Sequence, residues 1–378
     1  MRIGVPKETT PGERRVALVP ESAKKLIQAG YQVVVEAGAG SAAAFPDAAY
    51  REAGVTLEPS PATVLGADLV LKLNRPEESE VAAMRPGSIY LGSLMPLRNL
   101  ATVRALADRG VTAFSTDAIP RTTRAQSMDT LSSMANIAGY KGALLAAAEL
   151  NKYFPMLMTA AGMVPPARVF VVGAAVAGLQ AIATARRLGA NVFATDVRPE
   201  VKEQIESVGA KYVGIELKEA ASAGGGYAKE LTEEDRARQR ELLAAQCAQS
   251  DVVITTALIG GVFAPRLISA DMVKAMKPGS VIMDLAADGG GNCELSRPGE
   301  TVVVGGVTIA APLNLPATMP LHASLLFSRN LTAFLLAFTK DKTFQLDFTD
   351  DIQQGAAITH DGEVKHARTR DALQKAGT

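Results

Sequence analysis

Short apolar runs alternate with longer amphipathic stretches along most of the chain. The runs predict strands at residues 2–5, 32–36, 68–73, 88–92 and 112–115, and again at 168–172, 191–195, 251–256 and 280–285. Continuous apolar runs are typical of parallel strands that are buried on both faces. Because helical stretches separate them, the pattern predicts an α/β fold with doubly wound, Rossmann-like parallel sheets.

The alternation of strands and helices is interrupted once and then resumes. An Ala-rich apolar segment at 137–150 predicts a long helix, and the alternation starts again after residue 165. The segment 317–348 is expected to return to the first domain. We therefore predict a first domain of residues 1–130 plus 317–378 and a second of residues 131–316, joined by long helices with a cleft between them. The chain is long enough for two such cores.

The composition of the chain argues against several classes of function. The formal net charge is +0, so the chain has no basic footprint for nucleic acid. Cys247 and Cys293 are too few for a disulfide framework and are interpreted as reduced thiols of a cytosolic protein. His322, His360 and His366 are scattered, so no metal site is expected. The N-terminus lacks the apolar core of a signal peptide, and no apolar run approaches the ~18–20 residues that span a bilayer, so we expect a soluble chain.

Residues 119–136 form a polar stretch that leads directly into the apolar helix. Its polar side chains fall at i, i+3, i+4 and i+7, on one helical face: Asp129, Ser132, Ser133 and Asn136. Two interpretations fit this pattern, an ordinary N-cap at Asp129 or the wall of a ligand cleft. Arg121 and Arg124 stand just before the helix and bring cations beside the carboxylate and amides, which favours the ligand site.

Residues 168–196 have the layout of a dinucleotide-binding unit. A strand leads into a small-residue turn with Gly173 and Gly178, a helix follows, and the next strand ends at Asp196. Ala175 stands where the second glycine of the fingerprint is usual, which should weaken pyrophosphate binding without abolishing it, since the helix dipole remains. Asp196 would repel a 2′-phosphate and favours NAD(H) over NADP(H). Arg198 argues the reverse and is given less weight.

The run 121–129, Arg-Thr-Thr-Arg-Ala-Gln-Ser-Met-Asp, is followed by Leu-Ser-Ser at 131–133 and Asn-Ile-Ala-Gly-Tyr at 136–140. This segment closely resembles the signature of the proton-translocating nicotinamide nucleotide transhydrogenases, in their soluble NAD(H)-binding component. The resemblance extends from Met1 to about the last ten residues. More distantly, the chain is similar to alanine dehydrogenase.

The transhydrogenase resemblance implies direct hydride transfer between NADH and NADP⁺ and a set of partners. The NADP(H) site and the proton channel would belong to membrane-embedded partner subunits. The chain would form a homodimer, through a hairpin expected within 288–292 and 302–309, and would lie on the cytoplasmic face of the membrane. Because the sequence ends at Thr378, a separate soluble subunit is expected.

The same resemblance assigns roles to individual residues. Arg121 and Gln126 would orient the nicotinamide carboxamide and ribose, while Asp129 and Ser132 would hold those groups and the ring. A loop at 221–230 would close over the nucleotide with Tyr227 at its tip. The remaining cofactor contacts would be Arg124, Ser127, Met128, Gly173, Val176, Ala177, Gly178, Asp196, Val197, Arg198, Gly226, Gln239 and Leu258.

Two other functions stay open. Arg15 and Lys72 end apolar elements, where an ordinary solvated side chain is the commoner explanation. In alanine dehydrogenase, which the chain resembles more distantly, an Arg and a Lys at these positions bind the substrate. However, that enzyme's essential His is absent from 91–96, and it lacks the Arg-Ala-Gln-Ser-Met-Asp run. The other alternative is an NAD-sensing module that supports no transfer.

Overall fold

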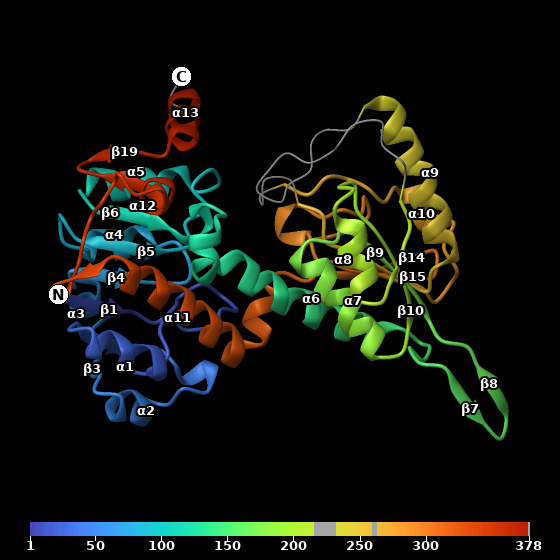
Figure 1. Cartoon of the computed structure of the whole chain (residues 1–378), viewed down its shortest axis with the longest axis horizontal. Helices are drawn as coiled ribbons and strands as arrows, with labels where there is room; N and C mark the ends of the chain where they lie inside the picture. Colours follow the sequence, from blue (N-terminus) through green and yellow to red (C-terminus); the bar gives the residue numbers. More distant parts are fainter. Residues whose placement is uncertain (215–231, 259–262, 377–378) are drawn as a thin grey trace. The chain divides into compact units, whose positions relative to one another are not determined.

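The computed structural model describes residues 1–214, 232–258 and 263–376. The chain divides into two compact units (Figure 1), unit 1 with Met1–Met134 and Ala317–Thr378 and unit 2 with Ala135–Pro316. The first break falls inside helix α6 (Thr130–Glu149).

Unit 1 is built on an eight-stranded sheet in the order β19-β18-β6-β5-β4-β1-β2-β3. The strands are β1 (Arg2–Val5), β2 (Gln32–Glu36), β3 (Thr56–Glu58), β4 (Leu69–Leu71), β5 (Ile89–Gly92), β6 (Thr112–Ser115), β18 (Ala357–His360) and β19 (Glu363–Val364). The adjacent strands β6, β5, β4, β1, β2 and β3 are all parallel. They include every strand predicted for this half of the chain. β18 and β19 add an antiparallel edge beside β6.

Both faces of this sheet are buried, as its apolar strands require. Leu69 and Leu71 pack on one face with residues of α1, α11 and α12, whereas Val70 packs on the other with residues of α3, α4 and α5. The helices of unit 1 are α1 (Pro20–Gln28), α2 (Asp47–Glu52), α3 (Pro61–Leu65), α4 (Glu78–Ala83), α5 (Leu100–Asp108), α11 (Pro320–Ala337), α12 (Asp351–Ala356) and α13 (Ala367–Ala376). Unit 1 is therefore a doubly wound sheet.

The C-terminal segment is part of the core of unit 1. Phe114 of β6 packs against Phe334 of α11, with ring centroids 5.6 Å apart, and against Phe344 of β17 (Thr343–Phe344) at 5.9 Å. β17 pairs only with β16 (Thr339–Lys340) in the described chain. Residues more than 200 positions apart thus share one aromatic cluster.

Unit 2 is built on a seven-stranded sheet in the order β11-β10-β9-β12-β13-β15-β14. Its strands are β9 (Arg168–Val172), β10 (Asn191–Thr195), β11 (Lys211–Tyr212), β12 (Val252–Thr255), β13 (Val281–Asp284), β14 (Thr301–Val304) and β15 (Val307–Ala310). All are parallel except β14. The hairpin expected within 302–309 is β14–β15, and β15 attaches it to β13 as the edge of the sheet.

Helices bury both faces of this sheet as well. Alternate residues of β9 belong to different clusters: Val169 and Val171 pack with α6, α7 and α8, and Phe170 packs with α9 and α10. The further helices are α7 (Val176–Arg187), α8 (Val201–Ser207), α9 (Glu233–Gln249) and α10 (Ala270–Lys274). The charged helix α9 buries Leu243 and Cys247. The carboxyl ends of β9, β10 and β12 meet at one edge, where ligands bind in sheets of this kind.

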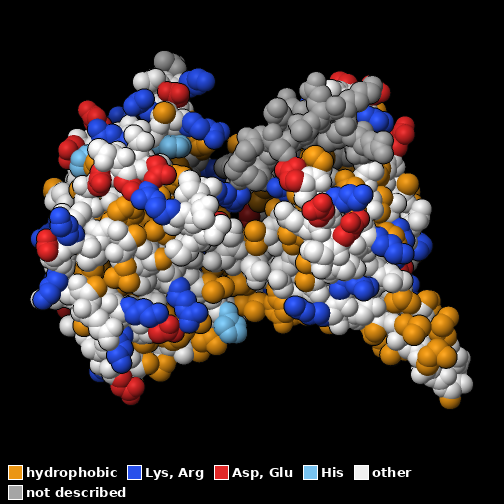
Figure 2. Space-filling model, viewed as in Figure 1, with side chains coloured by type: hydrophobic (Ala, Val, Ile, Leu, Met, Phe, Trp, Pro, Cys, Tyr) orange, Lys and Arg blue, Asp and Glu red, His pale blue; other side chains and the backbone are white. Residues whose placement is uncertain are grey.

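A separate hairpin of unit 2 was not predicted. It consists of β7 (Leu157–Thr159) and β8 (Gly162–Val164), which pair with each other and with no other described strand. Figure 2 shows hydrophobic side chains gathered on it, and Met158 and Met163 are 73% and 62% exposed. The sequence signal was weak because the strands are very short and lie next to a long helix.

No helix among the described residues is both long and apolar enough to cross a bilayer.

Replacing Phe334 by Ala should destabilise unit 1 by about 3–5 kcal/mol, because it leaves a cavity beneath β6 in the aromatic cluster. Phe334 is 1% exposed, whereas Leu336 on the same helix is 38% exposed. Leu336→Ala is therefore the matched control and should change stability little. Urea unfolding of both variants measures the difference, and equal losses would mean that the C-terminal segment is not part of the core.

Candidate functional site

The polar stretch after β6 forms a cavity within unit 1. A 3₁₀ helix, η3 (Thr123–Met128), precedes α6, and together with the chain before them they enclose ≈ 350 Å³. The lining residues are Ile119, Pro120, Arg121, Thr122, Thr123, Ala125, Gln126, Asp129 and Ser132. The cavity therefore brings together Arg121, Gln126, Asp129 and Ser132, the residues to which the family resemblance assigns roles in hydride transfer.

Asp129 both caps helix α6 and lines this cavity. Its Oδ1 accepts a hydrogen bond from the Ser132 backbone N–H at 2.8 Å, and its Oδ2 accepts one from Ser132 Oγ at 2.6 Å. The N-cap interpretation is thus confirmed, and it does not compete with a place in the cavity wall. Because the two bonds fix both side chains, their orientation is set before any ligand arrives.

The neighbouring residues have different surroundings. Arg121 and Gln126 are exposed, whereas the Met128 side chain is 4% exposed and packs in the hydrophobic core. Only the backbone of Met128 is therefore available for the predicted cofactor contact. Arg124 binds Asp350 through Nη1 at 2.6 Å and also contacts Asp351.

Two supports of η3 escaped the sequence analysis. Asn330 of α11 donates through Nδ2 to the Ser127 carbonyl at 2.8 Å, and Asp350, the N-cap of α12, holds Arg124. Both belong to the C-terminal segment, about 200 residues away from η3 in the sequence, so no local pattern could have identified them.

In unit 2 the turn after β9 requires its two glycines. Gly173 has φ +89°, and a Cβ on it would lie 2.9 Å from Thr256 Oγ1. A Cβ on Gly178 would lie 1.9 Å from the Gly173 carbonyl oxygen, so its absence lets α7 pack against the end of β9. Ala175 is the N-cap of α7 and provides no side-chain cap. Val176 and Ala177 follow as the first residues of the helix, with Val176 37% exposed.

Asp196 directly follows β10 and is hydrogen-bonded to this turn. Its Oδ2 accepts from the Ala174 N–H at 2.8 Å and from Arg198 Nη2 at 2.8 Å, and its Oδ1 accepts from Arg198 Nε at 2.9 Å. The hydrogen bonds that Arg198 donates to Asp196 raise the pKa of Arg198 despite its partial burial. Val197, between them, is half-buried. The predicted ribose carboxylate therefore stands beside the turn, paired with the arginine that the sequence analysis treated as secondary.

The loop after β12 completes this edge of the sheet. Thr256 Oγ1 donates a hydrogen bond to the Gly173 carbonyl at 2.9 Å. Asn292 is fully buried; its Oδ1 accepts from the Ala257 N–H, and its Nδ2 donates to the Ala257 carbonyl. Leu258 follows and is 37% exposed. Thr256 and Asn292 are positioning residues that the sequence analysis missed, because neither belongs to a fingerprint.

The remaining predicted cofactor contacts are Gln239, Gly226 and Tyr227. Gln239 lies half-buried in α9. The predicted contacts Gly226 and Tyr227, with the whole loop 221–230, lie outside the described residues.

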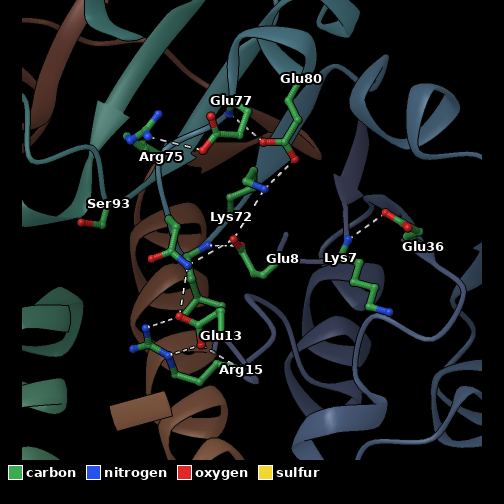
Figure 3. Close-up of polar contacts among 12 residues, drawn as sticks. Lys7, Glu8, Glu13, Arg15, Glu36, Lys72, Arg75, Glu77, Glu80 and Ser93 are labelled. Carbon is green, nitrogen blue, oxygen red and sulfur yellow. Dashed lines mark hydrogen bonds and ion pairs between the residues drawn. The ribbon is translucent and has the colours of Figure 1, made fainter. Parts of the chain in front are cut away.

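A second group of charges lies at the carboxyl ends of β1 and β4 in unit 1 (Figure 3). Lys72 binds Glu80 at 2.7 Å and Glu8 at 3.5 Å, and Arg15 binds Glu13 at 2.6 Å. The expectation of solvated side chains was wrong, since Lys72 is 1% and Arg15 8% exposed. Buried charges have to be paired, and the glutamates that pair them were not singled out in the sequence. A cavity of ≈ 710 Å³ borders the group, lined in part by Thr9, Thr10, Asn74, Arg75, Glu80 and Ser93.

The pKa values of Glu8 and Glu13 are shifted in opposite directions. Burial raises the pKa of Glu8 more than the charge of Lys72 lowers it. Burial also acts to raise the pKa of Glu13, but the hydrogen bonds and charge of Arg15, together with Asn74, lower it to about 2. Glu13 is therefore the firmly ionised carboxylate of the group.

Family models match almost the whole chain. The model for the alanine dehydrogenase/PNT N-terminal domain matches residues 4–138, and the model for the C-terminal domain matches residues 142–367.

Individual proteins of known name agree with these models. The chain is 46% identical over 370 residues to NAD(P) transhydrogenase subunit alpha of Cereibacter sphaeroides, covering 96% of this chain and 71% of that protein. The crystal structure of transhydrogenase from Sinorhizobium meliloti superposes with a TM-score of 0.88 at 45% identity, covering 96% of this chain and 100% of that one. Alanine dehydrogenase of Halomonas elongata is 31% identical, covering 99% of this chain and 97% of that protein.

The low pKa of Glu13 predicts a defined acid sensitivity. Its folded pKa of about 2 lies below the ordinary value of 4.5, so its contribution is fully present above pH 4.5 and is lost as the pH falls towards 2. The difference corresponds to roughly 3 kcal/mol. In Glu13→Gln, urea unfolding followed from pH 6 to pH 2 should lack this part of the acid-dependent loss, and stability at pH 6 should fall because Arg15 loses its partner.

Exposed Glu78 on α4 provides the control. Glu78→Gln should keep the wild-type pH dependence. An identical pH dependence in Glu13→Gln and the wild type would contradict the assignment.

Proposed function

Because the chain belongs to the alanine dehydrogenase/PNT family, we propose that it is the NAD(H)-binding subunit of a proton-translocating NAD(P) transhydrogenase. The observation that carries the proposal is the cavity lined by Arg121, Gln126, Asp129 and Ser132. These side chains can hold and orient a nicotinamide, and the described lining contains no His, Cys or Lys for acid–base or nucleophilic work. Direct hydride transfer needs neither an acid–base group nor a nucleophile.

The turn of unit 2 fits a dinucleotide. The absence of Cβ atoms at Gly173 and Gly178 lets α7 pack closely against the end of β9, and no side chain of Ala175 caps the N-terminus of α7. A helix N-terminus of this kind favours a pyrophosphate. We assign the pyrophosphate to the Gly173–Gly178 turn and the adenosine ribose to Asp196, with Val176, Ala177, Val197 and Leu258 as further contacts.

The protein's part in the transfer is positioning. Bound NADH supplies the hydride. Arg121 and Gln126 donate hydrogen bonds that orient the carboxamide and the ribose, and the Asp129–Ser132 pair keeps the cavity wall in one arrangement. Such a reaction depends on aligned rings, close approach and exclusion of water rather than on proton transfer to a side chain. The NADP⁺ that accepts the hydride is assigned to a membrane-embedded partner subunit, which also carries the proton channel.

The alanine dehydrogenase alternative is less well supported. Arg15 and Lys72, its substrate-binding candidates, already have glutamate partners within the chain. A substrate carboxylate would have to compete with Glu13, Glu8 and Glu80 for the same cations.

The decisive experiment uses membranes of the source organism from which this subunit has been stripped. Adding the purified chain back should restore NADH-dependent reduction of NADP⁺. Gln126→Ala should lower the restored rate by roughly 10- to 100-fold, the effect of losing one or two oriented hydrogen bonds to the reacting ring. Gln354→Ala changes an exposed glutamine outside the cavity and should restore the wild-type rate.

Other outcomes of this experiment identify the alternatives. Turnover of pyruvate plus ammonium by the isolated chain would establish an amino-acid dehydrogenase. NADH binding with no transfer in the restored membranes would indicate a sensing module.

We also propose that the protein is a homodimer, with the β7–β8 hairpin reaching the second copy. Its exposed methionines are an apolar surface that a monomer would leave in water. Met158→Asp with Met163→Asp should convert the dimer to a monomer in analytical ultracentrifugation, with unit 2 still folded. Val303→Asp places one such charge on exposed β14 and should leave the dimer intact. The opposite pattern would assign the interface to the β14–β15 hairpin.

A further inference from the structure

Helix α6 approaches the first turn of α7 more closely than a side chain would allow. A Cβ on Gly139 of α6 would lie 2.1 Å from the Ala177 carbonyl oxygen, 2.9 Å from the carbonyl carbon and 3.0 Å from the Cα of the same residue. All three are backbone atoms, and carbon and oxygen atoms in contact ordinarily stay about 3.3 Å or more apart. Within unit 2 the backbones of the two helices therefore meet directly at Gly139 (Figure 1).

A hydrogen bond joins the same two helices nearby. Asn136 Nδ2 donates to Gln180 Oε1 at 3.1 Å. Asn136 precedes Gly139 by three residues and Gln180 follows Ala177 by three, so both contacts lie on the faces that the helices turn towards each other. Alanine is more favourable than glycine in the interior of a helix. Since Gly139 has no positive φ, it is the approach of α7, and not its own backbone conformation, that requires a glycine.

The next residue of α7 is held just as closely. A Cβ on Gly178 would lie 1.9 Å from the Gly173 carbonyl oxygen and 3.2 Å from Thr256 Oγ1. Two close contacts, one at Ala177 and one at Gly178, thus fix the place of the first turn of α7. The N–H groups of the first turn of a helix have no partner within the helix and are available to an anion. The place of the turn therefore decides whether they reach a pyrophosphate.

We infer that Gly139 is a positioning residue for dinucleotide binding, because its lack of a side chain lets α6 hold the first turn of α7 where the N–H groups reach the pyrophosphate. The inference rests on the proposed NAD(H)-binding function and adds a residue of α6 to it. A methyl group on residue 139 would have to move the turn by about 1 Å to reach an ordinary contact distance. Hydrogen bonds span only about 2.7–3.2 Å between heavy atoms, so a shift of this size weakens or breaks them.

The same helix provides a matched control. Gly142 is buried like Gly139, and a Cβ on it would lie 2.6 Å from both methyl carbons of Leu285. These carbons are the end of a half-buried side chain, which can turn aside, and not the backbone of α7. Gly139→Ala and Gly142→Ala give α6 the same gain in helix propensity. The contact with the backbone of α7 is what distinguishes the two variants.

The test measures binding of NADH to the full chain by nucleotide fluorescence, with ADP and adenosine as competitors. Gly139→Ala should bind NADH and ADP roughly 10- to 100-fold more weakly than the wild type, the effect of losing one or two hydrogen bonds to a charged group. Adenosine has no phosphate and should bind as it does to the wild type. Gly142→Ala should bind all three compounds with wild-type affinity.

Steady-state kinetics in the restored membranes separate positioning from a general loss of structure. Gly139→Ala should raise the KM for NADH, while kcat at saturating NADH should change much less, because the residues that line the cavity beside η3 are unchanged. A lower kcat with an unchanged KM would overturn the inference. So would wild-type affinity for NADH in folded Gly139→Ala, an equal loss of affinity for adenosine, or an equal loss of NADH affinity in Gly142→Ala.

A second variant decides the matter if urea unfolding shows that Gly139→Ala does not fold. Asn136→Ala removes the bond to Gln180 without inserting an atom between the helices. It should weaken binding of NADH and ADP by roughly 3- to 10-fold and leave adenosine unaffected, and unchanged affinity for all three would then overturn the inference. Failure of the wild type to bind NADH would overturn the proposed function instead.

Discussion

Burial of both faces of two parallel sheets is the constraint on which the rest of the structure depends. Since helices cover each face, the strand interiors are restricted to apolar side chains, and the polar chemistry is confined to the strand ends. The carboxyl ends of parallel strands meet at one edge of each sheet. There unit 1 collects the group around Lys72 and Glu8, and unit 2 collects the Gly173 turn and Asp196.

Carboxylates organise the cavity beside η3, the turn after β9 and the charged group of unit 1, and each is bonded to donors of this chain. Asp129 holds Ser132 at the start of α6, Asp196 holds Ala174 and Arg198 at the fingerprint turn, and Glu13 holds Arg15. Leaving any of them unpaired would be costly. The same bonds that stabilise the fold also fix the direction in which these groups point. For a reaction that needs alignment rather than acid–base chemistry, this fixed geometry is what the protein has to contribute.

The C-terminal segment links the stability of unit 1 to the cavity beside η3. Phe334 packs beneath β6, while Asn330 on the same helix bonds the Ser127 carbonyl and Asp350 binds Arg124. The chain that completes the core of unit 1 is therefore also the chain that holds η3. A change in this segment would reach the cavity through these contacts without touching a ligand.

The sequence by itself determined the α/β class, most strands, and the positions of Asp129, Gly173 and Asp196, because apolar runs, helix caps and the dinucleotide fingerprint are local patterns. It did not determine that Lys72 is buried, that the sheet of unit 1 has an antiparallel edge, or that β7 and β8 form an outlying hairpin. Nor did it reveal the support of η3 by Asn330. These features depend on which distant segments meet, and on very short strands whose periodicity is too weak to read. Only the tertiary structure decides them, because pairing and burial are properties of the packed chain.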